Sequence, residues 1–240
     1  MALLSFACTA CGDCCRGFSR EATDWEPERG PVVRLSQDPG LPLLSWEWHR
    51  LRRIAAERGL APDVAPFDGV LDLQGGRVVV LSYRLRALAC PFLADSDAAP
   101  GPRSAAWGFA RGGTCTVYEH RPLACRAFPL VPMRNGIALS LHCPEVRDAD
   151  PASADELRAV YGDSYDAAVR FRAAPDLAVR LVQDLEAAGR VRIARDALAL
   201  AREVWASWPL TDVCDLAAEH GLGAWQDLEA RARAGTAQAH

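Results

Sequence analysis

The stretch CTACGDCC, residues 8–15, places four cysteines close together near the start of the chain. The C-x2-C-x2-C spacing lets the backbone curl, so that three sulfur atoms can turn towards one centre. Gly12 favours this because glycine readily adopts positive φ angles. The same spacing opens the cluster-binding motif of bacterial ferredoxins. We therefore expect a metal site to be built around this stretch.

Four further cysteines follow before residue 144, and two of them, Cys90 and Cys143, precede proline. A cysteine followed by proline also completes the ferredoxin motif. The predicted metal ligands are Cys8, Cys11, Cys14, Cys15, Cys90, Cys115, Cys125 and Cys143. A ninth cysteine, Cys214, stands far from the others and is predicted to be a small buried side chain in a helix.

Cys14 and Cys15 are adjacent, which leaves the number of metal centres open. Neighbouring side chains in extended backbone point to opposite sides. Unless the backbone turns sharply here, the two cysteines serve different centres, or one of them is not a ligand. Eight cysteines can form two four-thiolate sites, or one cluster with the remaining thiols supporting it or binding a second metal.

Arginines close to these cysteines are predicted to contact the metal centre. Four thiolates around a core of formal charge 2+ leave a net charge of roughly −2, which is costly to bury without compensation. Hydrogen bonds from guanidinium groups to sulfur would compensate it, and the candidates are Arg16, Arg121 and Arg126. His142, beside Cys143, is an alternative ligand.

Composition excludes several classes of function. The net charge of −4 gives no basic surface for nucleic acid or an anionic membrane. All 27 basic residues are arginines, so lysine Schiff-base chemistry and a Walker-type phosphate loop are excluded. No stretch approaches the roughly 20 apolar residues of a membrane span, and no basic segment starts a signal peptide. We expect a cytoplasmic protein, where cysteines bind metal more often than they form disulfides.

Hydrophobic spacing predicts one helix and two β-hairpins in the cysteine-bearing half. The helix covers 46–58 and ends at Gly59. The first hairpin pairs 70–73 with a strand beginning at 78–80, and the second pairs 130–133 with 137–141. Between the hairpins, the small and polar residues of 94–113 predict a mobile loop.

Strand signals stop after residue 151. Helices are predicted over 152–161, 165–171, 175–188, 191–208, 212–220 and 223–233. The expected fold class is therefore α+β, with a metal-binding domain over 1–148 and an all-helical region over 149–240 packed on it.

The combined cysteine pattern resembles the YkgJ-like CxxCxxCC family of zinc- or iron-chelating domains. The matching pieces are 8–15, CPFL at 90–93, CTVYE at 115–119 with Arg121-Pro122, CR at 125–126 with Phe128-Pro129, and Cys143. The resemblance covers about residues 6–144. It implies metal chelation by eight cysteines and kinship with the N-terminal part of flagellin lysine methylase, and so an S-adenosylmethionine-linked methyl transfer. This chain has no glycine-rich nucleotide loop after a strand, and Cys214 lies outside the family pattern.

Three functions fit these observations. In the first, the thiolates hold an iron–sulfur cluster, a [4Fe-4S] cluster in particular, in a redox or methyl-transfer role with a protein or small-molecule redox partner. In the second, zinc is a structural metal in a scaffold or interaction protein without catalysis. The third is metal storage, metal delivery or thiol redox chemistry. No Ser-His-Asp set and no pair of carboxylates identifies catalytic residues.

Overall fold

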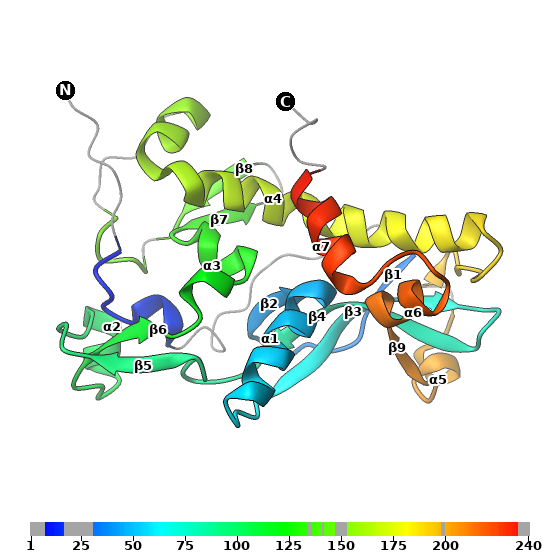
Figure 1. The fold of residues 1–240 in the computed structure, drawn as a ribbon, viewed down its shortest axis with the longest axis horizontal. Helices are drawn as coiled ribbons and strands as arrows, with labels where there is room; N and C mark the ends of the chain where they lie inside the picture. The colour runs from blue at the N-terminus through cyan, green and yellow to red at the C-terminus, as the bar shows by residue number, and fades with distance from the viewer. Residues whose placement is uncertain are drawn as a thin grey trace. The chain divides into compact units, whose positions relative to one another are not determined.

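The computed structural model describes residues 8–16, 31–133, 136–140, 142–146, 153–197 and 200–234. Its contacts divide the chain into two compact units, which are described separately (Figure 1). Unit 1 comprises Met1–Thr23, Pro39–Leu41 and Arg86–Arg172, and unit 2 comprises Asp24–Asp38, Pro42–Leu85 and Ala173–His240. These units do not follow the boundary expected between residues 148 and 149. Antiparallel strands and helices occur in both units, which confirms the α+β fold class.

A five-stranded sheet forms the centre of unit 2. Its strand order is β1 (Val32–Arg34), β3 (Val64–Asp72), β4 (Arg77–Leu85) and β2 (Leu41–Leu44), and β9 (Leu210–Asp212) pairs with β4 in parallel. The predicted hairpin is confirmed as β3 and β4, with Gly76 at a φ of 57° in its turn. Val70, Val79 and their neighbours are fully buried, so β-branched residues fill the core on this sheet.

Three helices pack together in unit 2: α1 (Ser45–Glu57), α6 (Val213–Glu219) and α7 (Trp225–Ala234). Both α1 and α6 also contact β4 (Figure 1). The helix predicted over 46–58 is confirmed as α1, because Trp46, Leu51 and Ile54 share one buried face. It ends before Gly59, whose φ of 65° is the left-handed conformation that suits glycine after a helix. The last two predicted helices are confirmed as α6 and α7.

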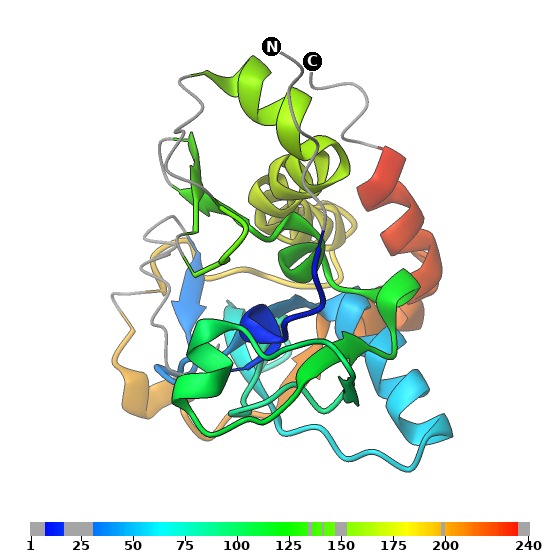
Figure 2. The ribbon, with the colours of Figure 1, turned by 90° about the vertical axis from the view of Figure 1, so that its left-hand side faces the viewer.

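As far as residue 153, unit 1 consists of short elements. Two antiparallel pairs, β5 (Leu93–Ser96) with β6 (Gly112–Cys115) and β7 (Leu130–Met133) with β8 (Gly136–Leu139), alternate with single-turn helices (Figure 2). These helices are η1 (Asp13–Cys15), α2 (Pro102–Ala106), η3 (Tyr118–His120) and α3 (Leu123–Ala127). The pair β7 and β8 confirms the second predicted hairpin.

The prediction that 94–113 is a loop without regular elements is wrong, because β5, α2 and β6 occupy half of this segment. Its small residues permit close packing. A Cβ atom on Gly112 would lie 2.7 Å from the Ala10 carbonyl oxygen, and one on Gly113 would lie 2.6 Å from Leu93 Cδ1. Small residues, which also occur in loops, are therefore needed at Gly112 and Gly113 for close packing of this strand.

The helices predicted over 152–161, 165–171 and 175–188 merge into α4 (Ala154–Ala187), with non-helical backbone at Gly162. In unit 1, Leu157 and Ala168 of this helix pack with Leu130. In unit 2, Val182 and Leu185 are fully buried.

The helix predicted over 191–208 is wrong, as is the expectation that everything after residue 149 is helical. Only α5 (Arg202–Trp205) is helical among the described residues of this segment. The Ala194 N–H instead donates to the Leu71 carbonyl oxygen (3.0 Å), and Ile193 forms a β-bridge with Asp72. Pairing with β3 and burial at the sheet outweigh the local helical propensity here.

Candidate metal centre

All eight predicted cysteine ligands belong to unit 1. The loop containing η1 carries four of them. Cys90 lies three residues before β5, and Cys115 is the last residue of β6. Cys125 lies in α3, and Cys143 follows β8. None is in a disulfide. Segments that are 128 residues apart in sequence (15 to 143) thus contribute thiols to one unit.

A sharp turn brings the adjacent cysteines together. Gly12 has a φ of 84° and precedes the 3-10 turn of η1, in which the Cys15 N–H donates to the Gly12 carbonyl oxygen (3.0 Å). The sulfur atoms of Cys14 and Cys15 consequently lie 3.7 Å apart. Adjacent cysteines point to opposite sides in extended backbone, but the backbone turns sharply here. Both thiols can therefore face one centre.

Backbone hydrogen bonds attach this loop to the later cysteine segments. The Cys90 N–H donates to the Cys15 carbonyl oxygen (2.8 Å), and Arg16 forms a β-bridge with Ala89. The Gly113 N–H, two residues before Cys115, donates to the Ala10 carbonyl oxygen (2.9 Å). These bonds fix the loop beside Cys90 and the strand that carries Cys115.

Asp13 anchors the same loop to α2. Its carboxylate is 1% exposed and accepts the backbone N–H groups of Ser104 (2.8 Å) and Arg103 (3.2 Å) at the start of that helix. The Gly101 N–H donates to the Cys11 carbonyl oxygen (3.1 Å). A Cβ on Gly101 would lie 2.3 Å from the Asp13 carboxylate, so glycine is needed for this approach. No signal in the sequence indicated this anchoring role, because α2 itself was not expected.

We expect Asp13→Ala to lower the free energy of unfolding by about 2–4 kcal/mol, because two buried N–H groups lose their acceptor. Asp13→Asn retains one carbonyl oxygen and is the matched control, with a smaller loss. Urea unfolding followed by circular dichroism measures both variants. Equal stability of Asp13→Ala and the wild type would contradict the anchoring role.

Other thiols contribute to the raised pKa values of several cysteines. The hydrogen bond with Cys14 and burial raise the pKa of Cys15, and the nearby thiols of Cys125 and Cys90 raise it further. Burial, followed by the proximity of Cys115 and Cys14, raises the pKa of Cys90 to about 11. Charge–charge repulsion of this kind acts over short distances in a protein. Thiols from four chain segments therefore share one electrostatic environment.

Cys143 and Cys11 belong to the same group. Burial raises the pKa of Cys143 to about 11, and the thiols of Cys14 and Cys11 contribute. Burial also raises the pKa of Cys11, with a further contribution from Cys14. Seven of the eight predicted ligands take part in these interactions.

The three predicted arginines differ in their surroundings. The Arg16 guanidinium is buried, donates to the carbonyl oxygens of Arg111 (2.8 Å) and Gly112 (3.3 Å), and stacks on Phe109. Its described contacts thus support the backbone before Cys115, and its buried Nε has no partner among the described residues.

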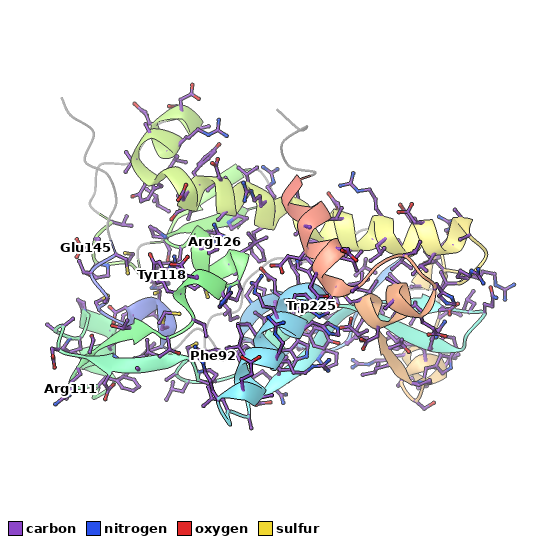
Figure 3. All side chains as sticks on the ribbon, viewed as in Figure 1. Phe92, Arg111, Tyr118, Arg126, Glu145 and Trp225 are labelled. Carbon is purple, nitrogen blue, oxygen red and sulfur yellow. The ribbon has the colours of Figure 1, made fainter. Side chains whose placement is uncertain are left out.

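Arg121 lies over the ring of Tyr118 at 3.6 Å and donates to the Tyr118 carbonyl oxygen (3.1 Å). A hydrogen bond from Cys15 lowers the pKa of Cys14, and the positive charge of Arg121 lowers it further. Arg126 directly follows Cys125 in α3, and Figure 3 shows it in the same region as Tyr118. Arg121 thus lies close enough for its charge to lower the pKa of a predicted cysteine ligand.

Sulfur separations bear on the kind of metal. Zn–S bonds of about 2.3 Å in a tetrahedron place sulfur ligands roughly 3.8 Å apart. Cys14 and Cys15 have this separation, but among the described residues no three cysteine sulfur atoms lie within 4.8 Å of one another. Ligands of a polynuclear cluster bind different iron atoms and lie farther apart than ligands of one ion.

A group of polar residues in unit 2 was missed by the sequence analysis. His49, Asp212 and Cys214 are buried, and one ligand atom of each lies within 4.8 Å of the others. Ser45 and His49 share a helix face at i, i+4 spacing, and Asp212 precedes a helix that it caps. The spacing of Ser45 and His49 and the capping position of Asp212 can both be read from the sequence. Only the pairing of β9 with β4 brings Asp212 close to α1.

No family model, curated protein or solved structure matches this chain. None of the helices in the described ranges is long and apolar enough to cross a membrane.

Proposed function

We propose that the eight cysteines of unit 1 hold an iron–sulfur cluster, most simply a [4Fe-4S] cluster, and that the protein has a redox role in the cytoplasm. The observation that carries this proposal is the backbone pairing that holds the loop of Cys11, Cys14 and Cys15 beside Cys90 and beside the strand that carries Cys115. Buried thiols that repel one another when ionised gain stability when a cationic centre binds them.

The donor set supports iron–sulfur ligation. All eight candidates are cysteines, and thiolates are the usual ligands of iron–sulfur clusters, whereas zinc sites often include histidine. The cluster would supply reversible one-electron transfer. The cysteines would hold it, and Arg121 and Arg126 would offset its negative charge from the adjoining turns. With thiol pKa values of about 11 at Cys90 and Cys143, metal binding must displace their protons.

The partner is a redox protein or a small molecule that exchanges electrons with the cluster. The resemblance to the YkgJ-like family suggests an S-adenosylmethionine-linked methyl transfer as an alternative to the redox role. The net charge of −4 argues against nucleic acid as the partner.

A structural zinc site in a non-catalytic scaffold is the alternative. The 3.7 Å separation of Cys14 and Cys15 favours it, since this is the distance between two sulfur ligands of one zinc ion. The short elements of unit 1 also fit a fold in which a metal replaces part of the hydrophobic core.

Anaerobic purification of the full chain, followed by an absorption spectrum and elemental analysis, decides between these functions. We expect a brown protein with comparable amounts of iron and acid-labile sulfide, whose visible absorption bleaches with dithionite. A colourless protein with zinc, and without iron or sulfide after anaerobic cluster reconstitution, would contradict the cluster and establish the zinc scaffold.

A further inference from the structure

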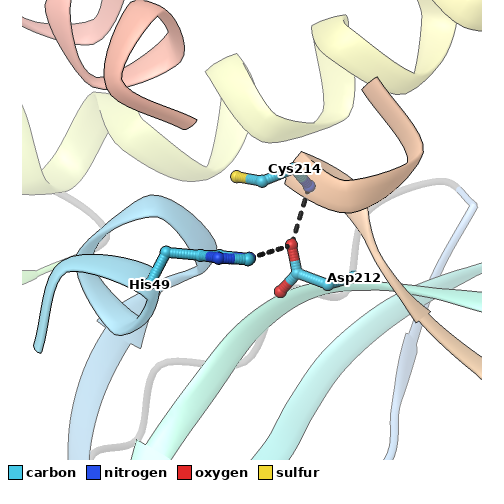
Figure 4. A group of neighbouring side chains, drawn as sticks. All are labelled: His49, Asp212 and Cys214. Carbon is cyan, nitrogen blue, oxygen red and sulfur yellow. Dashed lines mark hydrogen bonds and ion pairs between the residues drawn. The ribbon is translucent and has the colours of Figure 1, made fainter. Parts of the chain in front are cut away.

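A second set of potential metal ligands lies in unit 2 and includes none of the eight cysteines of the proposed cluster. His49 comes from α1, Asp212 ends β9 and Cys214 lies in the first turn of α6 (Figure 4). All three side chains are buried, and Cys214 is 2% exposed. Their ligand atoms, a ring nitrogen, a carboxylate oxygen and a thiol sulfur, lie within 4.8 Å of one another.

Hydrogen bonds hold these ligands in place. Asp212 Oδ1 lies 3.0 Å from His49 Nε2 and accepts the Cys214 backbone N–H (2.7 Å). The Ser45 hydroxyl lies 2.5 Å from Asp212 Oδ1 and 3.0 Å from Cys214 Sγ. Asp212 Oδ2 accepts the Tyr83 hydroxyl (2.6 Å). Hydrogen bonds to a ligating carboxylate are typical of the residues that orient metal ligands.

We propose that unit 2 binds a divalent cation of the zinc class through His49 Nε2, Asp212 and Cys214 Sγ. Nitrogen, oxygen and sulfur donors in one buried site match the preferences of zinc, and three protein ligands leave a fourth position for Ser45 Oγ or water. The site is independent of the proposed function, because it shares no residue with the cysteine centre.

The charges of the donor groups suit a dication. The Asp212 carboxylate and a Cys214 thiolate together carry two negative charges, and metal binding would displace the thiol proton to solvent. A further carboxylate is close, because Asp215 Oδ1 lies 3.6 Å from His49 Nε2, but its side chain is 62% exposed.

One exposed residue opposes metal binding. Arg52 Nη2 lies 3.3 Å from His49 Nδ1, and a guanidinium can only donate, so Nε2 carries the proton and points it at Asp212. A metal on Nε2 requires the other tautomer, with a proton on Nδ1. Arg52 is exposed and can move away at little cost. Its replacement by glutamate would give Nδ1–H an acceptor, the arrangement usual for metal-bound histidine.

Zinc retention by the full-length protein tests the site. Wild type, His49→Gln, Cys214→Ser and Tyr83→Phe are purified anaerobically, incubated with excess ZnCl2, desalted and analysed for zinc and iron. We expect His49→Gln and Cys214→Ser each to retain one zinc per chain less than wild type, with unchanged iron. Tyr83→Phe removes a hydrogen bond to Asp212 but no ligand, and it is expected to keep the zinc.

Equal zinc in wild type, His49→Gln and Cys214→Ser would overturn the site and leave the group as a network of hydrogen bonds. Equal loss in Tyr83→Phe would overturn it as well, since disrupted packing would then explain the loss. Arg52→Glu is expected to tighten zinc binding roughly 10-fold, and weaker binding would contradict ligation through Nε2. If zinc instead of iron fills the cysteine centre, total zinc rises in every protein, but the difference of one zinc persists. Failure of the proposed function is therefore distinguishable from failure of this site.

Discussion

Replacing Cys11 with serine is expected to remove the iron of unit 1 and much of its stability together. A serine hydroxyl does not ionise near neutral pH and is a poor ligand for iron. The backbone has no need of the thiol here, since the Cys11 carbonyl oxygen still accepts the Gly101 N–H. Structural metal sites contribute roughly 10–16 kcal/mol of apparent binding free energy, so losing the metal costs several kcal/mol of stability.

Elemental iron, acid-labile sulfide and the thermal unfolding midpoint measure this result. Cys214→Ser is the matched control, because it changes the same atoms in unit 2 and is expected to keep iron and colour. Cys143→Ser tests the most distant segment of the centre and is expected to behave as Cys11→Ser does. Full iron in both Cys11→Ser and Cys143→Ser would show that these thiols are not ligands.

Replacing Asp212 with alanine is expected to lower the free energy of unfolding by about 3–5 kcal/mol even without metal. The change leaves three side-chain donors without their shared acceptor, the buried Ser45 and His49 and the partly buried Tyr83. It also removes the N-terminal cap of α6, since the Cys214 N–H loses its partner. These bonds connect α1 and β4 with the segment that enters α6.

Urea unfolding at neutral pH in the presence of a chelator measures this change separately from any bound zinc. Tyr83→Phe loses one of the four hydrogen bonds and is expected to cost about 1–2 kcal/mol. A loss for Asp212→Ala no larger than that for Tyr83→Phe would show that Asp212 does not organise these elements.

Local signals in the sequence predicted several elements correctly. The helix α1 follows from apolar residues at helical spacing and from Gly59 at its end, all within fourteen residues of Trp46. The hairpin of β3 and β4 follows from the strand signal of 70–73 and the β-branched run of 78–80, on either side of Gly75 and Gly76. Spacing and turn residues act through the nearest part of the chain, so no knowledge of distant contacts was needed.

Predictions failed where distant contacts determine the backbone. The segment 191–208 has helical spacing, yet Ala194 pairs with Leu71 of β3. The segment 94–113 has the composition of a loop, yet Gly112 and Gly113 lie where larger side chains would clash with Ala10 and Leu93. In both segments a hydrogen bond or a close approach to a remote strand outweighs the local preference.

The sequence by itself determined which residues are candidate metal ligands, because the identity and spacing of cysteines limit the chemistry that they support. Tertiary structure decided how these residues meet. It turned Cys14 and Cys15 towards each other through Gly12, and anchored their loop through Asp13 to a helix that the sequence did not predict. It also joined His49 to Asp212 across 163 residues. Such contacts depend on strand pairing and packing between remote segments, and residue spacing carries no record of them.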